Sequence, residues 1–207
     1  MADKFDDDLL LSPKSGYGIK FSEKSIAATS LSGEFGWRDI TTQITVKGVG
    51  AADPSWAQIG SGPMYAFKFG LNDECWSAIH IPHDIVPGQP IFFHAHWLAD
   101  GTDSNTVKWQ WDYMYARGFG QDAYSVAGTT ITAEQASAGQ YYHMVTETGG
   151  ASITNLDEPD GIIYVHLKRI SNGGTDNTDG IFLLTQDVHY QSTNIGTINK
   201  SPVFYRG

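Results

Sequence analysis

The chain has 207 residues, and 13 Lys and Arg residues against 23 Asp and Glu residues give a formal net charge of −10. This balance argues against a nucleic-acid groove or an anionic membrane surface, because both bind clusters of lysine and arginine. The single cysteine, Cys75, excludes an internal disulfide framework and a zinc site built from cysteines. No apolar run approaches the ~20 residues of a membrane span, and residues 1–8 lack the basic segment of a signal peptide. We expect no nucleic-acid partner, no membrane partner and synthesis in a reducing compartment.

Charged residues make up 17% of the chain, against ~25% in an average soluble domain. Aromatic residues reach 13%, and there are 23 glycines. This composition is typical of strands and turns, and it also suits surfaces that become buried in an assembly, where unpaired charge is costly. The length fits one large all-β domain. We therefore expect an N-terminal arm over residues 1–32 and a single domain over residues 33–207.

The N-terminal segment combines acids, Ser, Lys and Gly with one apolar tripeptide, LLL at positions 9–11. One interpretation is a flexible tail. The other is an extended arm that docks on a neighbouring subunit or on a partner. In the second interpretation, the apolar anchors between the acids are Phe5, Leu9, Leu10 and Leu11.

Strand periodicity dominates the rest of the chain. From Val107 onward, apolar and aromatic side chains occupy every second position through Tyr115, and residues 91–97 alternate in the same way. Further strands are predicted over residues 64–70, 75–81, 141–146, 161–170 and 181–190. The best helix candidate is short, over residues 132–138 before Gly139. Because clusters of Gly, Pro, Asn and Asp separate the strands, we predict an all-β fold, an antiparallel two-sheet β-sandwich of the jelly-roll type.

The spacing Gly88-x5-His94-x-His96 matches the first half of the metal motif of cupins, in which two histidines share one side of a strand. Such a pair binds Zn, Fe, Mn or Ni once a carboxylate and a third histidine complete the ligand set. Here Asp100 stands where glutamate is expected, and no later histidine follows a Pro and Gly at the spacing of the second half. We expect no metal and no cofactor, with a metal-dependent cupin enzyme as an alternative.

Several histidines alternate with apolar residues and therefore lie on the less apolar side of their strands. One interpretation is an ordinary solvated sheet face. The other is a polar interface across a symmetry axis, formed by His94, His96, Asp112, His166, Asp187 and His189. Motifs for nucleophilic or nucleotide chemistry, such as a Gly-x-Ser-x-Gly elbow or a P-loop, do not occur in the sequence. We expect no catalytic residues.

The order of several segments resembles small virion structural proteins of tailed bacteriophages. The segments are FGWRDI at 35–40, IPHDIVPG at 81–88, FHAHW at 93–97, VKWQWDY at 107–113, HLKRI at 166–170 and LLTQDVHY at 183–190. The resemblance covers about residues 35–194 and rests on order and spacing rather than on a catalytic signature.

The resemblance implies a jelly roll that forms homotrimers and has no enzymatic activity. It favours a capsid decoration (cement) protein, which binds the major capsid protein on the outer surface of the phage head and stabilises the shell. Such a protein is made in the cytoplasm of the host bacterium. The alternative is a tail-fibre or receptor-binding domain that recognises host-surface glycan through an exposed aromatic or polar pocket. Most tryptophans are predicted to be core residues, because Trp97, Trp109 and Trp111 share strand faces with other apolar residues.

Overall fold

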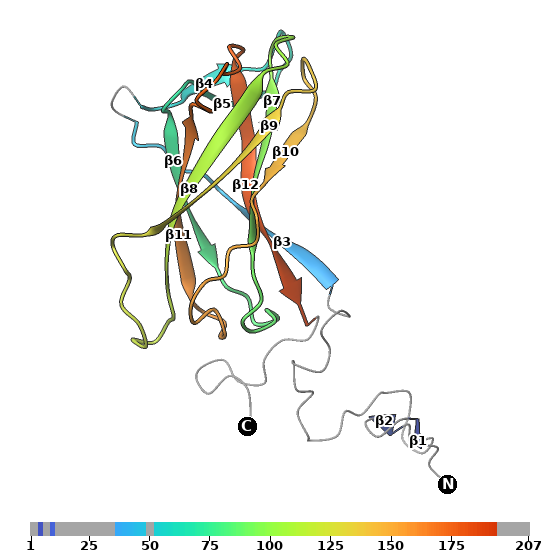
Figure 1. The fold of residues 1–207 in the computed structure, drawn as a ribbon, viewed down its shortest axis with the longest axis vertical. Helices are drawn as coiled ribbons and strands as arrows, with labels where there is room; N and C mark the ends of the chain where they lie inside the picture. Colours follow the sequence, from blue (N-terminus) through green and yellow to red (C-terminus); the bar gives the residue numbers. More distant parts are fainter. Residues whose placement is uncertain (1–3, 6–8, 11–35, 49–51, 194–207) are drawn as a thin grey trace.

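The computed structural model describes residues 4–5, 9–10, 36–48 and 52–193 (Figure 1). Within these ranges the chain is all-β, and two antiparallel sheets stack as a sandwich. The described ranges contain no helix, and therefore none long and apolar enough to cross a membrane. The predicted β-sandwich is confirmed, since alternating apolar positions on each strand supply the two inner faces.

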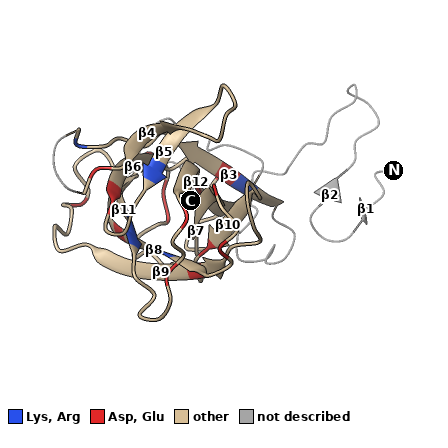
Figure 2. Ribbon diagram, turned by 90° about the horizontal axis from the view of Figure 1, so that it is seen from above, with Lys and Arg blue, Asp and Glu red and all other residues tan. Residues whose placement is uncertain are grey.

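The two sheets differ in size. The larger follows the order β10 (Met144–Glu147), β7 (Phe92–Ala99), β12 (Ile181–Ser192), β5 (Tyr65–Phe69) and β4 (Ser55–Gln58), and β3 (Gly36–Thr42) also pairs with β12. The smaller follows the order β6 (Glu74–His80), β11 (Ile162–Ile170), β8 (Thr106–Ala116) and β9 (Thr129–Ala136). Seen from above, charged residues are sparse on both sheets (Figure 2).

The pairing of the strands is nested, as in a jelly roll. The innermost pair is β8 with β9, followed outward by β7 with β10, β6 with β11, and β5 with β12. From β5 to β12 the chain changes sheet at every connection except β8–β9, because each pair lies in the sheet opposite to the next. This nesting brings strands far apart in sequence to the centre of each sheet, with β12 beside β7 and β11 beside β8.

The core lies between the two sheets and is rich in aromatic rings. Phe93 packs against Trp111 and Tyr113, with ring centroids 6.4 and 5.1 Å apart, and Phe69 meets Trp109 edge-on at 5.5 Å. The prediction that Trp97, Trp109 and Trp111 are core residues is confirmed, since all three are fully buried. Cys75 is also buried and free of any disulfide, as expected for a structural thiol.

The predicted helix over residues 132–138 is wrong, because residues 132–136 belong to β9 and residues 137–138 follow it without helical structure. The strand pairs with β8 along its whole length, from Tyr113 opposite Thr129 to Thr106 opposite Ala136. Ile131 packs against the core. The Ala, Glu and Gln residues favour a helix in isolation. Backbone hydrogen bonds to the edge of β8 outweigh this local preference.

Strand β12 contains an irregularity that decides which way its second half faces. Leu183 lies opposite Trp97 on β7, but the next paired residue is Thr185, opposite His96, so Leu184 is an extra residue. A bulge of one residue reverses the alternation of the residues that follow it. Leu183 and Val188 therefore both point into the core, while Asp187 points outward.

The N-terminal segment is described over two short pieces. β1 (Lys4–Phe5) and β2 (Leu9–Leu10) pair antiparallel with each other, with Phe5 opposite Leu9 and Lys4 opposite Leu10. Leu11 lies outside the described residues. The docking role expected for Phe5, Leu9, Leu10 and Leu11 stays a prediction.

Candidate functional site

The outer face of the larger sheet carries the two histidines of the cupin-like spacing. On β7, Phe93, Ala95 and Trp97 are fully buried in the core, so His94 and His96 project from the opposite face. The two histidines of the cupin-like spacing therefore lie on the outer face of the sandwich and not in its interior.

A row of polar side chains crosses three strands at His94. Asp187 on β12 and Glu147 on β10 are its directly opposite neighbours. The His94 ring contacts both carboxylates, since its Nε2 lies 2.6 Å from Glu147 Oε2 and its Nδ1 lies 3.3 Å from Asp187 Oδ1. The antiparallel register thus places one imidazole between two acids.

Two further histidines extend this row. His96 Nε2 lies 3.2 Å from Asp187 Oδ2, and His96 Nδ1 lies 2.9 Å from His143 Nε2. The ring of His189 stands nearly perpendicular to that of His94, with centroids 3.8 Å apart, and its Nδ1 lies 3.5 Å from Glu147 Oε2. We call the set His94, His96, Glu147, Asp187 and His189 the histidine–carboxylate cluster.

Two members of the cluster are buried although it lies on an outer sheet face. The side chains of His94 and Asp187 are 2% and 7% exposed. Burial alone would raise the pKa of Asp187, but the neighbouring rings of His94 and His96 lower it to about 2. Burial alone would lower the pKa of His94, but the two neighbouring carboxylates outweigh burial and raise it. Burial lowers the pKa of His189.

A second polar group lies on the outer face of the smaller sheet. His166 on β11 has Glu74 Oε2 2.9 Å from Nε2 and Asp112 Oδ2 3.2 Å from Nδ1. Its ring stacks on Trp76, with centroids 5.0 Å apart and planes 7° apart, and Lys47 pairs with Glu74. Hydrogen bonding by Lys47, opposed by burial and aided by His166, lowers the pKa of Glu74.

The six polar residues predicted from the sequence therefore fall into two groups on opposite sheets. His94, His96, Asp187 and His189 meet in the histidine–carboxylate cluster, whereas Asp112 and His166 lie together on the other side of the sandwich. Sequence analysis missed Glu147, which completes the row, and His143. Glu147 alternates with the buried Thr146 on β10, and this alternation indicates that Glu147 faces outward. Its position beside His94 follows only from the register between β10 and β7.

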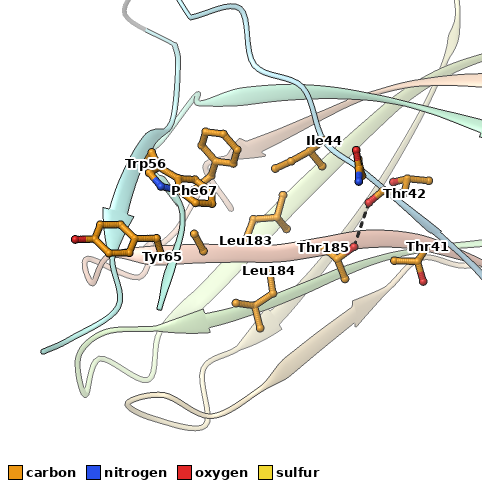
Figure 3. A pocket seen from close by; sticks show the side chains of 11 residues that line it. Thr41, Thr42, Ile44, Trp56, Tyr65, Phe67, Leu183, Leu184 and Thr185 are labelled. Atoms are coloured by element: carbon orange, nitrogen blue, oxygen red, sulfur yellow. Dashed lines mark hydrogen bonds between the residues drawn. The ribbon is translucent and has the colours of Figure 1, made fainter. Parts of the chain in front are cut away.

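A shallow groove of about 440 Å³ opens where β12 changes partner (Figure 3). β5 pairs with β12 over Ile181–Leu183 and β3 pairs with it from Gln186, so the bulge leaves a gap between the two partners. Thr185 spans this gap by donating a hydrogen bond to the Thr42 carbonyl, at 3.3 Å. The groove is lined by Thr41, Thr42, Gln43, Ile44, Trp56, Tyr65, Ala66, Phe67, Leu183, Leu184 and Thr185.

Trp56 forms an exposed aromatic wall of this groove. Its side chain is 62% exposed, and its ring stacks on Tyr65 with centroids 6.4 Å apart and planes 18° apart. The edge of Phe67 supports the ring from the core side, at 4.9 Å. The groove is lined by apolar, aromatic, hydroxyl and amide side chains, which can pack against a ligand and hydrogen-bond to it.

No protein-family model matches the chain, and no curated protein is significantly similar to it in sequence. Among solved structures, the chain is similar to the carbohydrate-binding module TmCBM61, determined in complex with β-1,4-galactotriose. The likeness has a TM-score of 0.31 and 15% sequence identity, and covers 78% of this chain and 92% of the module.

Proposed function

We propose that this chain is a structural protein of tailed-bacteriophage virions that acts as a capsid decoration protein. In this role it is a homotrimer without enzymatic activity. It binds the major capsid protein on the outer surface of the head. Because it binds the assembled shell and not the free capsid subunits, its binding shifts the equilibrium toward the shell and stabilises it. Trivalent attachment multiplies a weak contact of each subunit. It is made in the cytoplasm of the host bacterium and needs no cofactor.

The segments that resemble phage virion proteins support this proposal because they build the centres of both sheets. FHAHW lies in β7, VKWQWDY in β8, HLKRI in β11 and LLTQDVHY in β12. The resemblance therefore covers the residues that specify the nested jelly roll, together with the outward-facing histidines on both of its faces.

The observation that carries the proposal is a low share of charged residues, 17%, together with exposed large apolar side chains. Exposed apolar surface can be buried when a protein associates with a partner. Among the residues that the structure describes, the exposed large apolar side chains are those of Trp37, Trp56, Met64, Tyr65, Leu71, Phe119, Tyr124, Val126, Tyr141, Tyr142, Val145, Tyr164 and Leu184. Subunit contacts in a trimer and contacts with a shell would bury part of this surface.

Two measurements test the proposal together. Multi-angle light scattering of the purified full chain is expected to give three times the 22.6 kDa chain mass. Co-sedimentation with phage heads that lack the protein is expected to be saturable, in multiples of three chains for each capsomer junction. A monomer, or a trimer that does not sediment with heads, contradicts the decoration role.

The groove beside Trp56 favours a second candidate, a tail-fibre or receptor-binding domain that binds host-surface glycan. Sugar rings pack on exposed aromatic faces, and Thr41 and Gln43 add hydrogen-bonding groups to the same groove. In this role the chain binds host cells or lipopolysaccharide rather than heads.

A matched pair of tryptophan variants separates this candidate from the first. Trp56→Ala is expected to abolish binding to lipopolysaccharide, whereas Trp37→Ala, which removes an exposed tryptophan outside the groove, is expected to preserve it. Equal binding by both variants would exclude the groove as the glycan site.

A further inference from the structure

Three side chains of the histidine–carboxylate cluster point ligand atoms at one small volume. One nitrogen of His94, one nitrogen of His96 and a carboxylate oxygen of Asp187 all lie within 4.8 Å of one another. Nδ1 of His94 is 3.3 Å from Asp187 Oδ1, and Nε2 of His96 is 3.2 Å from Asp187 Oδ2. Tetrahedral bonds of ~2.0–2.1 Å to a zinc ion place neighbouring ligand atoms about 3.3–3.4 Å apart. The two histidine–carboxylate separations therefore match the spacing of neighbouring ligands around a zinc ion.

Two of these atoms are buried and have no hydrogen-bond partner. They are His94 Nδ1 and Asp187 Oδ1, which face each other outside hydrogen-bond geometry. A buried imidazole nitrogen or carboxylate oxygen without a partner costs free energy, because it has lost its hydration. Both atoms can donate a lone pair to a cation between them, so an ion would satisfy both at once.

The remaining nitrogens of the two rings already have partners of the kind that metal-binding histidines use. His94 Nε2 lies 2.6 Å from Glu147 Oε2, and His96 Nδ1 lies 2.9 Å from His143 Nε2. A metal-bound imidazole commonly gives its other N–H to a carboxylate or another acceptor, which sets the tautomer and orients the ring. Here Glu147 occupies Nε2 of His94, so Nδ1 is the nitrogen that faces Asp187 and is available to a metal ion.

We propose that His94, His96 and Asp187 bind a divalent transition-metal ion of the Zn²⁺ class. Two imidazoles and one carboxylate favour a borderline ion over Ca²⁺ or Mg²⁺, which prefer oxygen ligands throughout. The ion links β7 to β12 on the outer face of the larger sheet and acts as a structural clamp. This inference concerns the sandwich itself and is independent of the virion role proposed above.

The test uses the full chain without a histidine tag, freed of metal and titrated with Zn²⁺ in a calorimeter. The wild type is expected to bind one Zn²⁺ per chain, and added Zn²⁺ is expected to raise its thermal midpoint, because the ion binds the folded state. His96→Gln removes a partly exposed ligand and is expected to weaken Zn²⁺ affinity at least tenfold. His166→Gln is the matched control, because His166 also sits between two carboxylates but on the other sheet, and its affinity is expected to equal that of the wild type.

Three results would overturn the assignment. The first is that the wild type does not bind Zn²⁺, and the second is that His96→Gln binds Zn²⁺ as tightly as the wild type. The third is that His189→Gln loses affinity while His96→Gln keeps it, because the ion would then lie among His94, Glu147 and His189. X-ray absorption of the Zn²⁺-loaded wild type needs no variant and therefore decides the question even if His96→Gln does not fold. It is expected to show two imidazole ligands, and a spectrum without imidazole would also overturn the proposal.

Discussion

Trp109 and Trp56 show how differently one residue type contributes in this fold. The Trp109 side chain is fully buried and meets the edge of Phe69, whereas Trp56 is 62% exposed on the groove. Trp109→Ala is expected to lower the free energy of unfolding by about 3–5 kcal/mol, because it leaves a large cavity in the aromatic core. Urea unfolding monitored by circular dichroism measures this loss.

Trp56→Ala serves as the control for that measurement. Since its ring is mostly in solvent, its removal is expected to cost about 1 kcal/mol or less. Equal costs for the two variants would contradict the placement of Trp109 in the core and of Trp56 at the surface.

Glu74 links stability to pH. The hydrogen bond from Lys47 lowers the pKa of Glu74, whereas burial raises it. His166 lowers it further, so the pKa in the folded state is below the ordinary value of 4.5. A depressed carboxyl pKa contributes stability that is present above the unfolded value and is lost as the pH falls through the folded value. Glu74→Gln is therefore expected to lower stability at pH 7 and to flatten the decline in stability below pH about 4.5.

Chemical denaturation at a series of pH values between 7 and about 3 measures this slope. Glu134→Gln is a suitable control, because the Glu134 side chain is half exposed and its ion pair with Lys108 is long, at 3.5 Å. If the slope below pH about 4.5 is unchanged in Glu74→Gln, the contact with Lys47 does not stabilise the fold.

At the scale of single elements, the bulge in β12 determines both the groove and the cluster. Deletion of Leu184 is expected to prevent folding, because continuous alternation from Leu183 would turn Asp187 into the core and Val188 out of it. The amide spectrum of the deletion variant, compared with that of the wild type, reports the outcome.

Leu184→Ala keeps the extra residue and separates its backbone role from its side chain. The side chain is 42% exposed, so this substitution is expected to leave the fold unchanged and to reduce stability only slightly. A folded deletion variant with a native-like spectrum would mean that β12 tolerates the other register.

The strands that sequence analysis predicted well are those with strict period-two alternation of bulky side chains. Residues 107–115 and 161–170 nearly match β8 and β11, since each has one face in the core. β9 was mistaken for a helix because its inward face has the modest side chains of Ile131 and Ala133, while Glu134 and Gln135 favour helices. Its conformation depends on pairing with β8, which local sequence does not encode.

The candidate site was predictable in its parts but not in its arrangement. Alternation correctly placed His94, His96 and His189 on the outward side of their strands. Their meeting point depends on the register between β7 and β12, which lie about 90 positions apart and are offset by the bulge. Neither the register nor the bulge can be derived from spacing along the chain. For the same reason, the sequence does not reveal that Asp112 and His166 lie together on the other sheet.

At the scale of the whole molecule, the N-terminal arm can be tested apart from the sandwich. β1 and β2 pair with each other, and the described sheet pairings of the sandwich begin at β3. A chain that lacks residues 1–11 is therefore expected to fold and to keep its trimer mass, but to lose binding to phage heads. Light scattering and head co-sedimentation measure the two properties.

A matched chain in which Phe5, Leu9, Leu10 and Leu11 are all changed to Ser keeps the length and charge of the arm. If apolar anchoring is the cause, this chain is expected to fail in the same way as the truncation. Undiminished head binding by either chain would contradict the role of the arm.

The nested order of the strands also sets an order of folding. The loop 117–128 joins β8 to β9, whereas β5 and β12 are separated by residues 70–180, and closing a longer loop costs more chain entropy. Contacts between residues distant in sequence form slowly, so the hairpin β8–β9 is expected to form early and β12 to insert last. Because Asp187 and His189 arrive with β12, the histidine–carboxylate cluster is completed in the final step. Its assembly therefore reports that the sandwich has folded.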